Sequence, residues 1–535
     1  MWVRNLTFIA FVLAGAAALI GGMAPVKIQH RADSACTEDS PTPEYQPLIQ
    51  AVNDAFRQQW RAANITPVPP APELAIARRI ALALCGTVPS LQEIRRLEAN
   101  PSDRWQEAWL TGLFHDRRFA DYFAERLARI YVGTEDGPLL IFRRRRLVSW
   151  LSDELLRNRP YHELVCELIA GEGLWTDSPG TNFITVTVEP DKQEPNPERL
   201  AARVARAFLG VRLDCARCHD HPFQPWKQAD FQGLAAYFGQ VHPGLTGVHD
   251  GDGEFQAARG KTGSPRIVQP HVPFKPELLP GDGSRRSQLA RWITDPRNPA
   301  LARTTVNRVW ALLFGRPLVE PVDDLPSAGE PPRVLELLAG DFAAHGYDLQ
   351  RLIRVIAATE AFQLDSAGTS EPSDVHERLW AVFPLTRLRP EQVAGALFQT
   401  ASLETIDRSS HILVRIFNAI GENEFVKRYG DMGEDEFDRR TGTIPQRLLL
   451  MNGQLVSSMT EEGLLSAAFR ISFLTPDDRS AVETAYLTVL TRRPTAAEAS
   501  HFETSLTGTQ GHERKQRMSD LFWTLLNSTE FSWNH

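Results

Sequence analysis

Apolar residues recur three and four positions apart along most of the chain, and this spacing predicts a mainly helical fold. The segments 74–82, 105–114, 119–131 and 334–342 show the pattern clearly. In contrast, the segment 183–188 is short and rich in β-branched residues, which favours a strand. We therefore predict a mainly α fold with few short strands.

The chain has 535 residues, which is more than one hydrophobic core usually organises. Glycine and proline concentrate in residues 244–283. This composition predicts a connection between two helical domains, residues 71–243 and residues 284–535. Prolines also interrupt residues 25–70, which we interpret as a linker.

The first 24 residues have the pattern of a signal peptide or membrane anchor. Arg4 supplies a positive charge, and residues 6–24 are apolar without a charged side chain. The apolar run approaches the length of about 20 residues that spans a bilayer, so a cleaved signal and an uncleaved anchor both fit. We expect a cell-envelope protein, periplasmic or anchored in the inner membrane, with its domains outside the cytoplasm.

Charge argues against nucleic acid as a partner. The formal net charge is −8, and the chain lacks a long basic stretch. The four arginines at 143–146 lie between apolar residues, which favours the solvent-facing side of a helix. Cys85 and Cys166 lie in apolar segments and are expected to be small buried side chains.

The most specific chemical signature is Cys-x-x-Cys-His, formed by Cys215, Cys218 and His219. Two thiols three positions apart lie on neighbouring edges of one helical turn, where they can form thioethers with the two vinyl groups of haem. The following imidazole can then bind iron as an axial ligand. The sequence therefore predicts c-type haem in a redox or electron-transfer protein, with redox partner proteins of the envelope.

Other uses of the motif stay open. Cys215 and Cys218 can form a structural disulfide, or they can bind zinc together with His221. A structural zinc site needs four ligands, however, and no second Cys-x-x-Cys or His pair completes the set. These alternatives predict an envelope scaffold or interaction protein. The sequence offers several distal iron ligands without ranking them: His242, His249, His271 and Met432.

An apolar stripe precedes the motif. Leu200, Val204, Phe208 and Val211 follow one another at spacings of four, four and three, which predicts one helix. Gly210 is placed to end it. We therefore expect the motif to begin directly after a buried helix.

A second polar group lies in the C-terminal half. Asn307, Arg308, Asp323 and Asp324 could line a polar site of a hydrolase or another enzyme. Helix capping and a buried hydrogen-bond network explain them equally well. The chain lacks a nucleophile elbow, a P-loop and a dinucleotide-binding fingerprint, so the sequence leaves enzyme activity open.

Both halves resemble known families. Residues 207–210 and 215–223, with Pro225-Trp226, resemble a planctomycete cytochrome-c-like domain of unknown function. The C-terminal half is similar to the planctomycete-specific domain that usually follows it, in residues 306–310, 313–316, 318–324 and 526–531. The resemblance implies an exported planctomycete-type protein and supplies no activity.

Overall fold

The computed structural model describes residues 44–134, 141–189, 191, 193–259, 263–326, 329–368, 371–407, 425–426, 428–430, 443–452 and 467–535. The predicted signal or anchor, residues 1–24, lies outside the described residues, as does the first part of the predicted linker. Among the residues that are described, no helix has both the length and the apolar character to cross a membrane.

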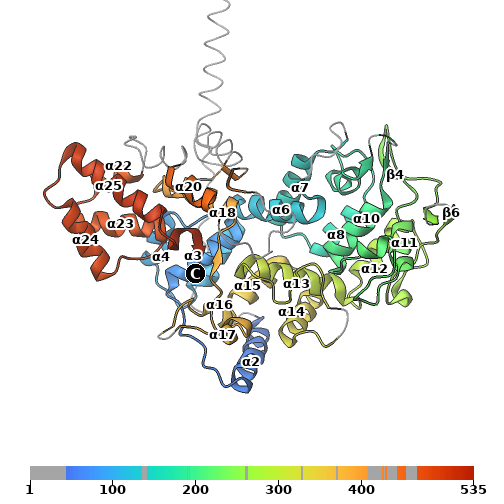
Figure 1. Cartoon of the computed structure of the whole chain (residues 1–535), viewed down its shortest axis with the longest axis horizontal. Coiled ribbons are helices and arrows are strands. Elements are labelled where there is room, and N and C mark those ends of the chain that lie inside the picture. Colours follow the sequence, from blue (N-terminus) through green and yellow to red (C-terminus); the bar gives the residue numbers. More distant parts are fainter. Residues whose placement is uncertain are drawn as a thin grey trace, which may run out of the picture.

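Helices dominate the first half of the chain (Figure 1). They are α2 Gln46–Ala62, α3 Glu73–Cys85, α4 Leu91–Ala99, α5 Trp105–Phe114, α6 Arg117–Val132, α7 Arg144–Leu156, α8 Tyr161–Ala170, α9 Asn182–Thr185, α10 Pro197–Val204 and α11 Gln228–Ala236. Short helical turns connect them: η1 Pro179–Thr181, η2 Ala205–Leu209 and η3 Cys215–Arg217.

The second half is also helical. Its helices are α12 Arg285–Thr294, α13 Pro299–Phe314, α14 Arg333–Ala344, α15 Leu349–Ala357, α16 Glu360–Gln363, α17 Asp374–Arg378, α18 Pro390–Thr400, α20 Ile444–Asn452, α22 Ala467–Leu474, α23 Asp478–Leu490, α24 Ala496–Leu506 and α25 Gly511–Leu526. The short turns are η4 Pro276–Leu278 and η5 Glu530–Ser532.

Among the described residues the strands are short, and each strand pairs with one antiparallel partner. The pairs are β1 Val188–Glu189 with β2 Glu194–Pro195, β3 Val241–Gly244 with β4 Gly247–Asp250, β5 Gln256–Arg259 with β6 Gly263–Ile267, and β7 Thr386–Arg387 with β8 Trp533–Asn534. The predicted mainly α fold with few short strands is therefore confirmed.

The strand predicted at 183–188 is wrong for most of its length. Asn182–Thr185 form helix α9, and only Val188 belongs to a strand. The side chain of Asn182 holds this turn, because its amide donates to the carbonyls of Trp175 and Pro179, both at 2.9 Å. Phe183 and Ile184 are fully buried, and burial on all sides removes the alternation that distinguishes a strand from a helix.

The described residues of the Gly- and Pro-rich segment 244–283 pack against the helices. They contain β4 and the described parts of a second hairpin, β5–β6. Val248, Phe255 and Val268 from this segment are buried in the same hydrophobic cluster as helices on both sides of it. The domain boundaries at 243 and 284 stay a prediction.

Two hydrophobic clusters fill the described part of the protein. The larger runs from Ile49 to Phe383 in sequence, and the smaller combines residues from Leu388 to Phe531 with Leu82 and Val88. Helix α3 contributes to both clusters, and it is buried from Ile76 to Cys85. In Figure 1, α22–α25 lie at one end of the long axis, and α8, α10, α11 and α12 lie at the other.

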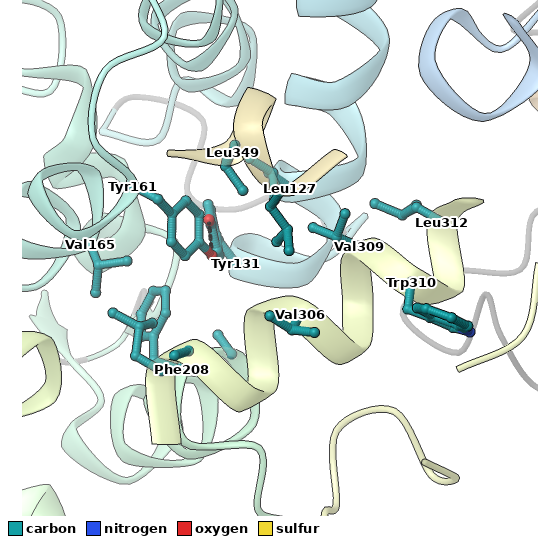
Figure 2. Close-up of a cluster of buried hydrophobic side chains, with 14 of the residues drawn as sticks. Leu127, Tyr131, Tyr161, Val165, Phe208, Val306, Val309, Trp310, Leu312 and Leu349 are labelled. Carbon is teal, nitrogen blue, oxygen red and sulfur yellow. Dashed lines mark hydrogen bonds between the residues drawn. The ribbon is translucent and has the colours of Figure 1, made fainter. Parts of the chain in front are cut away.

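The larger cluster joins the two halves of the sequence. Figure 2 shows Tyr131 of α6 and Tyr161 of α8 above Phe208 of η2, with Val306 of α13 to the lower right of the two tyrosines. The hydroxyl of Tyr131 donates to that of Tyr161 at 2.7 Å, which satisfies a buried polar group. Helix α13 therefore packs against the elements that lead into the Cys-x-x-Cys-His motif.

Candidate functional site

The predicted helix before the motif is confirmed for Leu200, Val204 and Phe208, whereas Val211 lies just beyond its end. Helix α10 begins at Pro197 after the N-cap Asn196, whose side chain accepts the backbone N–H of Arg199 at 3.0 Å. The helix widens to a π-turn over Ala205–Leu209 and ends at Gly210, which has a left-handed φ of 65°. All four residues of the predicted stripe are buried: Leu200, Val204, Phe208 and Val211.

The motif lies in a surface loop, residues 212–226, which we call the Cys-His loop. Leu213 and the central Ala216 of the short helix η3 are fully buried and pack the loop against the core. Cys215 and Cys218 are free and exposed. The turn therefore presents two thiols, three positions apart, on the surface.

Cys85 and Cys166 have a different environment. Cys85 is buried and Cys166 is half-buried, and both are free thiols. Burial raises the pKa of both thiols above the ordinary value. A raised pKa keeps a thiol protonated and unreactive. The chemically accessible cysteines among the described residues are therefore Cys215 and Cys218.

His219 is exposed, and its ring is held at one nitrogen. Its Nδ1 lies 2.7 Å from the carbonyl oxygen of Asp220. A neutral imidazole that donates from Nδ1 carries its lone pair on Nε2. Histidines that bind metals commonly have this arrangement, with the second ring nitrogen donating to a backbone carbonyl. His219 therefore has Nε2 available as a ligand atom.

His221 is used differently. Its Nδ1 accepts the backbone N–H groups of Phe223 at 3.2 Å and Gln224 at 3.1 Å. An imidazole that accepts at Nδ1 carries its proton on Nε2 when it is neutral. His221 thus stabilises the turn of the Cys-His loop, and metal binding through Nε2 would require loss of that proton.

Zinc and haem make different demands on these residues. A zinc site needs its ligand atoms to converge on one point. Nowhere among the described residues, the motif included, are three His, Cys, Asp or Glu side chains placed to hold a metal ion. Thioether attachment needs no such convergence, because each sulfur bonds to a separate vinyl group.

Three of the distal ligands considered from the sequence lie on β3, on β4 and in the segment beside α11. His242 and His249 are cross-strand partners in β3–β4, with ring centroids 6.5 Å apart. His271 lies against α11, where its backbone N–H donates to the carbonyl of Gly233 at 3.3 Å. Met432 lies outside the described residues.

The polar group of the second half contacts the motif segment. Asp323 accepts a hydrogen bond from the Arg212 guanidinium at 2.9 Å, and Asp324 accepts the Arg212 backbone N–H at 3.1 Å. The amide of Gln224 donates to the other carboxylate oxygen of Asp324 at 3.0 Å. Both aspartates therefore bind the Cys-His loop.

Asn307 and Arg308 hold backbone on either side of this contact. Asn307 is fully buried and both donates to and accepts from the peptide of Val319, at 2.8 Å and 2.9 Å. The Arg308 guanidinium donates to two carbonyls of η2, those of Arg206 and Ala207. These contacts favour the structural interpretation of the four polar residues over a hydrolase site.

Three further loop residues contribute contacts to which we assigned no role from the sequence. Gln224 links Asp324 to the loop, and its side-chain oxygen accepts the indole N–H of Trp226 at 2.7 Å. Trp226 packs against the large core cluster. Phe223 is 92% exposed, which leaves an apolar ring on the surface beside the motif. Local sequence carries no signal for contacts with residues about 100 positions away.

The fold and this loop define a mainly helical protein with two accessible thiols and an oriented histidine. Residues 51–243 match the family described as PSCyt2, protein of unknown function (DUF1549). Residues 285–415 match the family described as PSD1, protein of unknown function (DUF1553). The two follow each other in the order that the resemblance predicted. No curated protein and no solved structure matches the chain.

Proposed function

We propose that this protein binds c-type haem covalently through Cys215 and Cys218, with His219 as an axial ligand of the iron. The observation that carries the proposal is the Cys-His loop itself: two exposed free thiols on one turn, followed by an imidazole fixed at Nδ1. The donor set fits the group, since the thiols are accessible for attachment and Nε2 is available for iron. The cytochrome-type name of the family that matches residues 51–243 is in line with it.

Haem at this position supplies one-electron redox chemistry, and the protein supplies its orientation and surroundings. The thiols lie at the surface, so a group attached there is accessible to a partner protein. Phe223 of the same loop adds an exposed apolar ring. We therefore assign the protein to redox or electron transfer with partner proteins of the cell envelope.

The location is part of the proposal. Haem attachment through Cys-x-x-Cys-His belongs to compartments outside the cytoplasm, and residues 1–24 have the pattern of an export signal or anchor. Cell fractionation should recover the protein from the membrane or periplasmic fraction. Recovery of the full-length chain wholly from the cytoplasm would contradict this location.

A second candidate is an envelope scaffold in which Cys215 and Cys218 form a disulfide or bind zinc with His221. The exposure of both thiols on one turn also suits a disulfide in an oxidising compartment. This candidate predicts a colourless protein in which mass mapping finds the disulfide or elemental analysis finds zinc.

Two histidine variants distinguish the candidates. The protein should be purified from a host that matures c-type cytochromes, and its visible spectrum should be recorded in both oxidation states. His219→Ala should change the iron spectrum, because it removes the axial ligand. His221→Ala is the matched control, since it lies in the same loop but uses its Nδ1 for the turn. Equal effects of both substitutions, or a haem-free wild type, would contradict the proposal.

A further inference from the structure

Asp324 lies outside the motif but touches both ends of the Cys-His loop. One carboxylate oxygen accepts the backbone N–H of Arg212, three positions before Cys215, at 3.1 Å. The other accepts the side-chain amide of Gln224, six positions after Cys218, at 3.0 Å. One side chain therefore closes the loop that carries both thiols and His219.

The position of Asp324 is itself fixed by buried groups. Asn307 of α13 binds the carbonyls of Val319 and Val322, at 2.8 Å and 3.4 Å, and so holds the backbone directly before the aspartates. On the other side, the backbone N–H of Leu325 donates to the carbonyl of Gly210 at 2.7 Å. The segment that carries Asp324 is thus attached both to α13 and to the end of η2.

We propose that Asp324 is the positioning residue of the Cys-His loop, so that residues 319–325 of the C-terminal half set the geometry of a site whose thiols and histidine all lie in the N-terminal half. The effect of Asp324 on haem rests on the proposed function. The effect of Asp324 on the loop is independent of that function, because the contacts involve protein groups alone.

The chemistry of the contact requires a carboxylate. Asp324 receives two N–H donors, one on each oxygen, and a carboxylate is an acceptor at both. An asparagine would present its NH₂ group to one of these donors and lose that hydrogen bond. Asp323 differs, since it accepts from the guanidinium of Arg212 and leaves the backbone N–H of Arg212 to Asp324.

Hydrogen exchange in the full-length protein tests the positioning without haem. Asp324→Asn should speed amide exchange across the Cys-His loop about tenfold, the effect of losing a charge-assisted hydrogen bond from a local closed state. Asp323→Asn, with the same change in charge at the neighbouring position, should speed exchange in the loop much less, because its amide oxygen can still accept from the Arg212 guanidinium and the backbone N–H of Arg212 keeps its bond to Asp324. Equal effects of the two variants, or faster exchange spread evenly over the helices, would overturn the proposal.

Haem-loaded protein supplies the second measurement. Asp324→Asn should keep one covalently bound haem, because the thioethers need only the thiols, and it should shift the midpoint potential or the axial-ligand spectrum. Asp323→Asn should shift the potential and the spectrum by clearly less. An unchanged potential and spectrum in Asp324→Asn would show that the loop does not transmit its position to the iron. A wild type without haem would defeat the proposed function, and the exchange measurement would still decide the role of Asp324.

Gln224→Ala keeps the proposal testable where Asp324→Asn does not fold. Gln224 lies in the surface loop, and its truncation removes the contact with Asp324 together with the acceptor of the Trp226 indole N–H. It should speed exchange in the second half of the loop, and unchanged exchange there would overturn the proposal. Where Asp324→Asn folds, Gln224→Ala should add little when combined with it. Fully additive effects would mean that the two side chains act independently, and the proposal would fail.

Discussion

Arg79 shows how much of the molecule depends on single buried side chains. It is fully buried in α3, and its guanidinium donates to the carbonyls of Phe362, Leu364 and His535 at 2.7–3.0 Å. Burial lowers its pKa to about 9. Arg79→Ala should reduce the free energy of unfolding by about 3–5 kcal/mol, because the buried carbonyls of Phe362 and Leu364 and the partly buried carbonyl of His535 lose their donor. Urea denaturation measures the loss.

The control for this prediction is Arg145→Ala. Arg145 is exposed on α7, as the basic run in the sequence predicted for that position. Its removal should change the free energy of unfolding by no more than about 0.5 kcal/mol. Similar losses in both variants would show that Arg79 does not hold the chain terminus to α3.

Acid should weaken an ion cluster at the C-terminus. Hydrogen bonds from Arg492 lower the pKa of Glu498 to about 2. Burial pulls the pKa of Glu530 upward, but hydrogen bonds from Arg492 and His535 outweigh it and lower that pKa to about 2. A lowered carboxylate pKa gives stability that is complete above the ordinary value of 4.5 and is lost as the pH falls towards 2.

The substitution Arg492→Ala isolates this contribution. The variant should melt below the wild type at pH 7, and the gap between the two melting temperatures should close as the pH falls from about 4.5 to about 2. Thermal melts across this pH range measure the gap. A gap that stays constant with pH would contradict the assignment of the lowered pKa values to Arg492.

At the residue scale the sequence predicted the motif, but it did not predict the contacts that hold the Cys-His loop in place. Cys215, Cys218 and His219 are recognisable because their spacing is local. The bonds of Asp324 to Arg212 and Gln224 join positions 112 and 100 apart, which no local pattern encodes. For that reason Asp324 was considered for a polar site or a hydrogen-bond network within its own half, and in the structure it contacts the Cys-His loop.

Gly210 determines how the chain turns from the buried helix into the Cys-His loop. Its φ of +65° lies in the left-handed region, and a Cβ there would clash with Thr304 Oγ1 and lie 3.3 Å from Leu325 Cδ1. Gly210→Ala should lower the free energy of unfolding by about 1–3 kcal/mol. Adding Thr304→Ala should recover the steric part of the loss. Denaturant unfolding of the single and double variants measures both effects.

A helical glycine with open surroundings is the matched control. Gly340 lies in α14, and a Cβ added there would meet no described atom within 4 Å beyond its own turn of helix. Gly340→Ala should therefore stabilise the protein by about 0.5–1 kcal/mol through helix propensity. A loss of stability at Gly340 as large as that at Gly210 would contradict the argument from backbone conformation and close contact.

At the element scale, periodicity predicted well wherever one face of a helix is buried. The apolar stripe that begins at Leu200 predicted the helix, because α10 has one apolar face. Gly210 predicted where the helix ends, because it supplies the left-handed cap. The strand prediction for residues 183–188 was wrong, because α9 is buried on all sides and its β-branched residues are also typical of a strand. Hydrogen bonds from the Asn182 side chain to backbone carbonyls stabilise the helical turn in that segment. The local sequence pattern does not predict these bonds.

For the whole molecule, the shared core predicts that the two halves depend on each other. The larger cluster includes Phe208 from one half and Val306 from the other, and Leu82 of α3 belongs to the C-terminal cluster together with Val88. Residues 44–283 and 284–535 expressed separately should therefore lack cooperative thermal transitions, because each exposes one side of a common core. Two cooperative transitions, one from each fragment, would contradict this and favour independent domains.

The central claim is that Cys215 and Cys218 carry haem, and the intact mass of the protein tests it most directly. The full chain should be produced in a host that matures c-type cytochromes and measured under denaturing conditions, which remove any group that is not covalently bound. The wild type should exceed the mass of its polypeptide by one haem, and Cys215→Ser/Cys218→Ser should have the polypeptide mass alone. A wild type from that host with the mass of the bare polypeptide would contradict the claim.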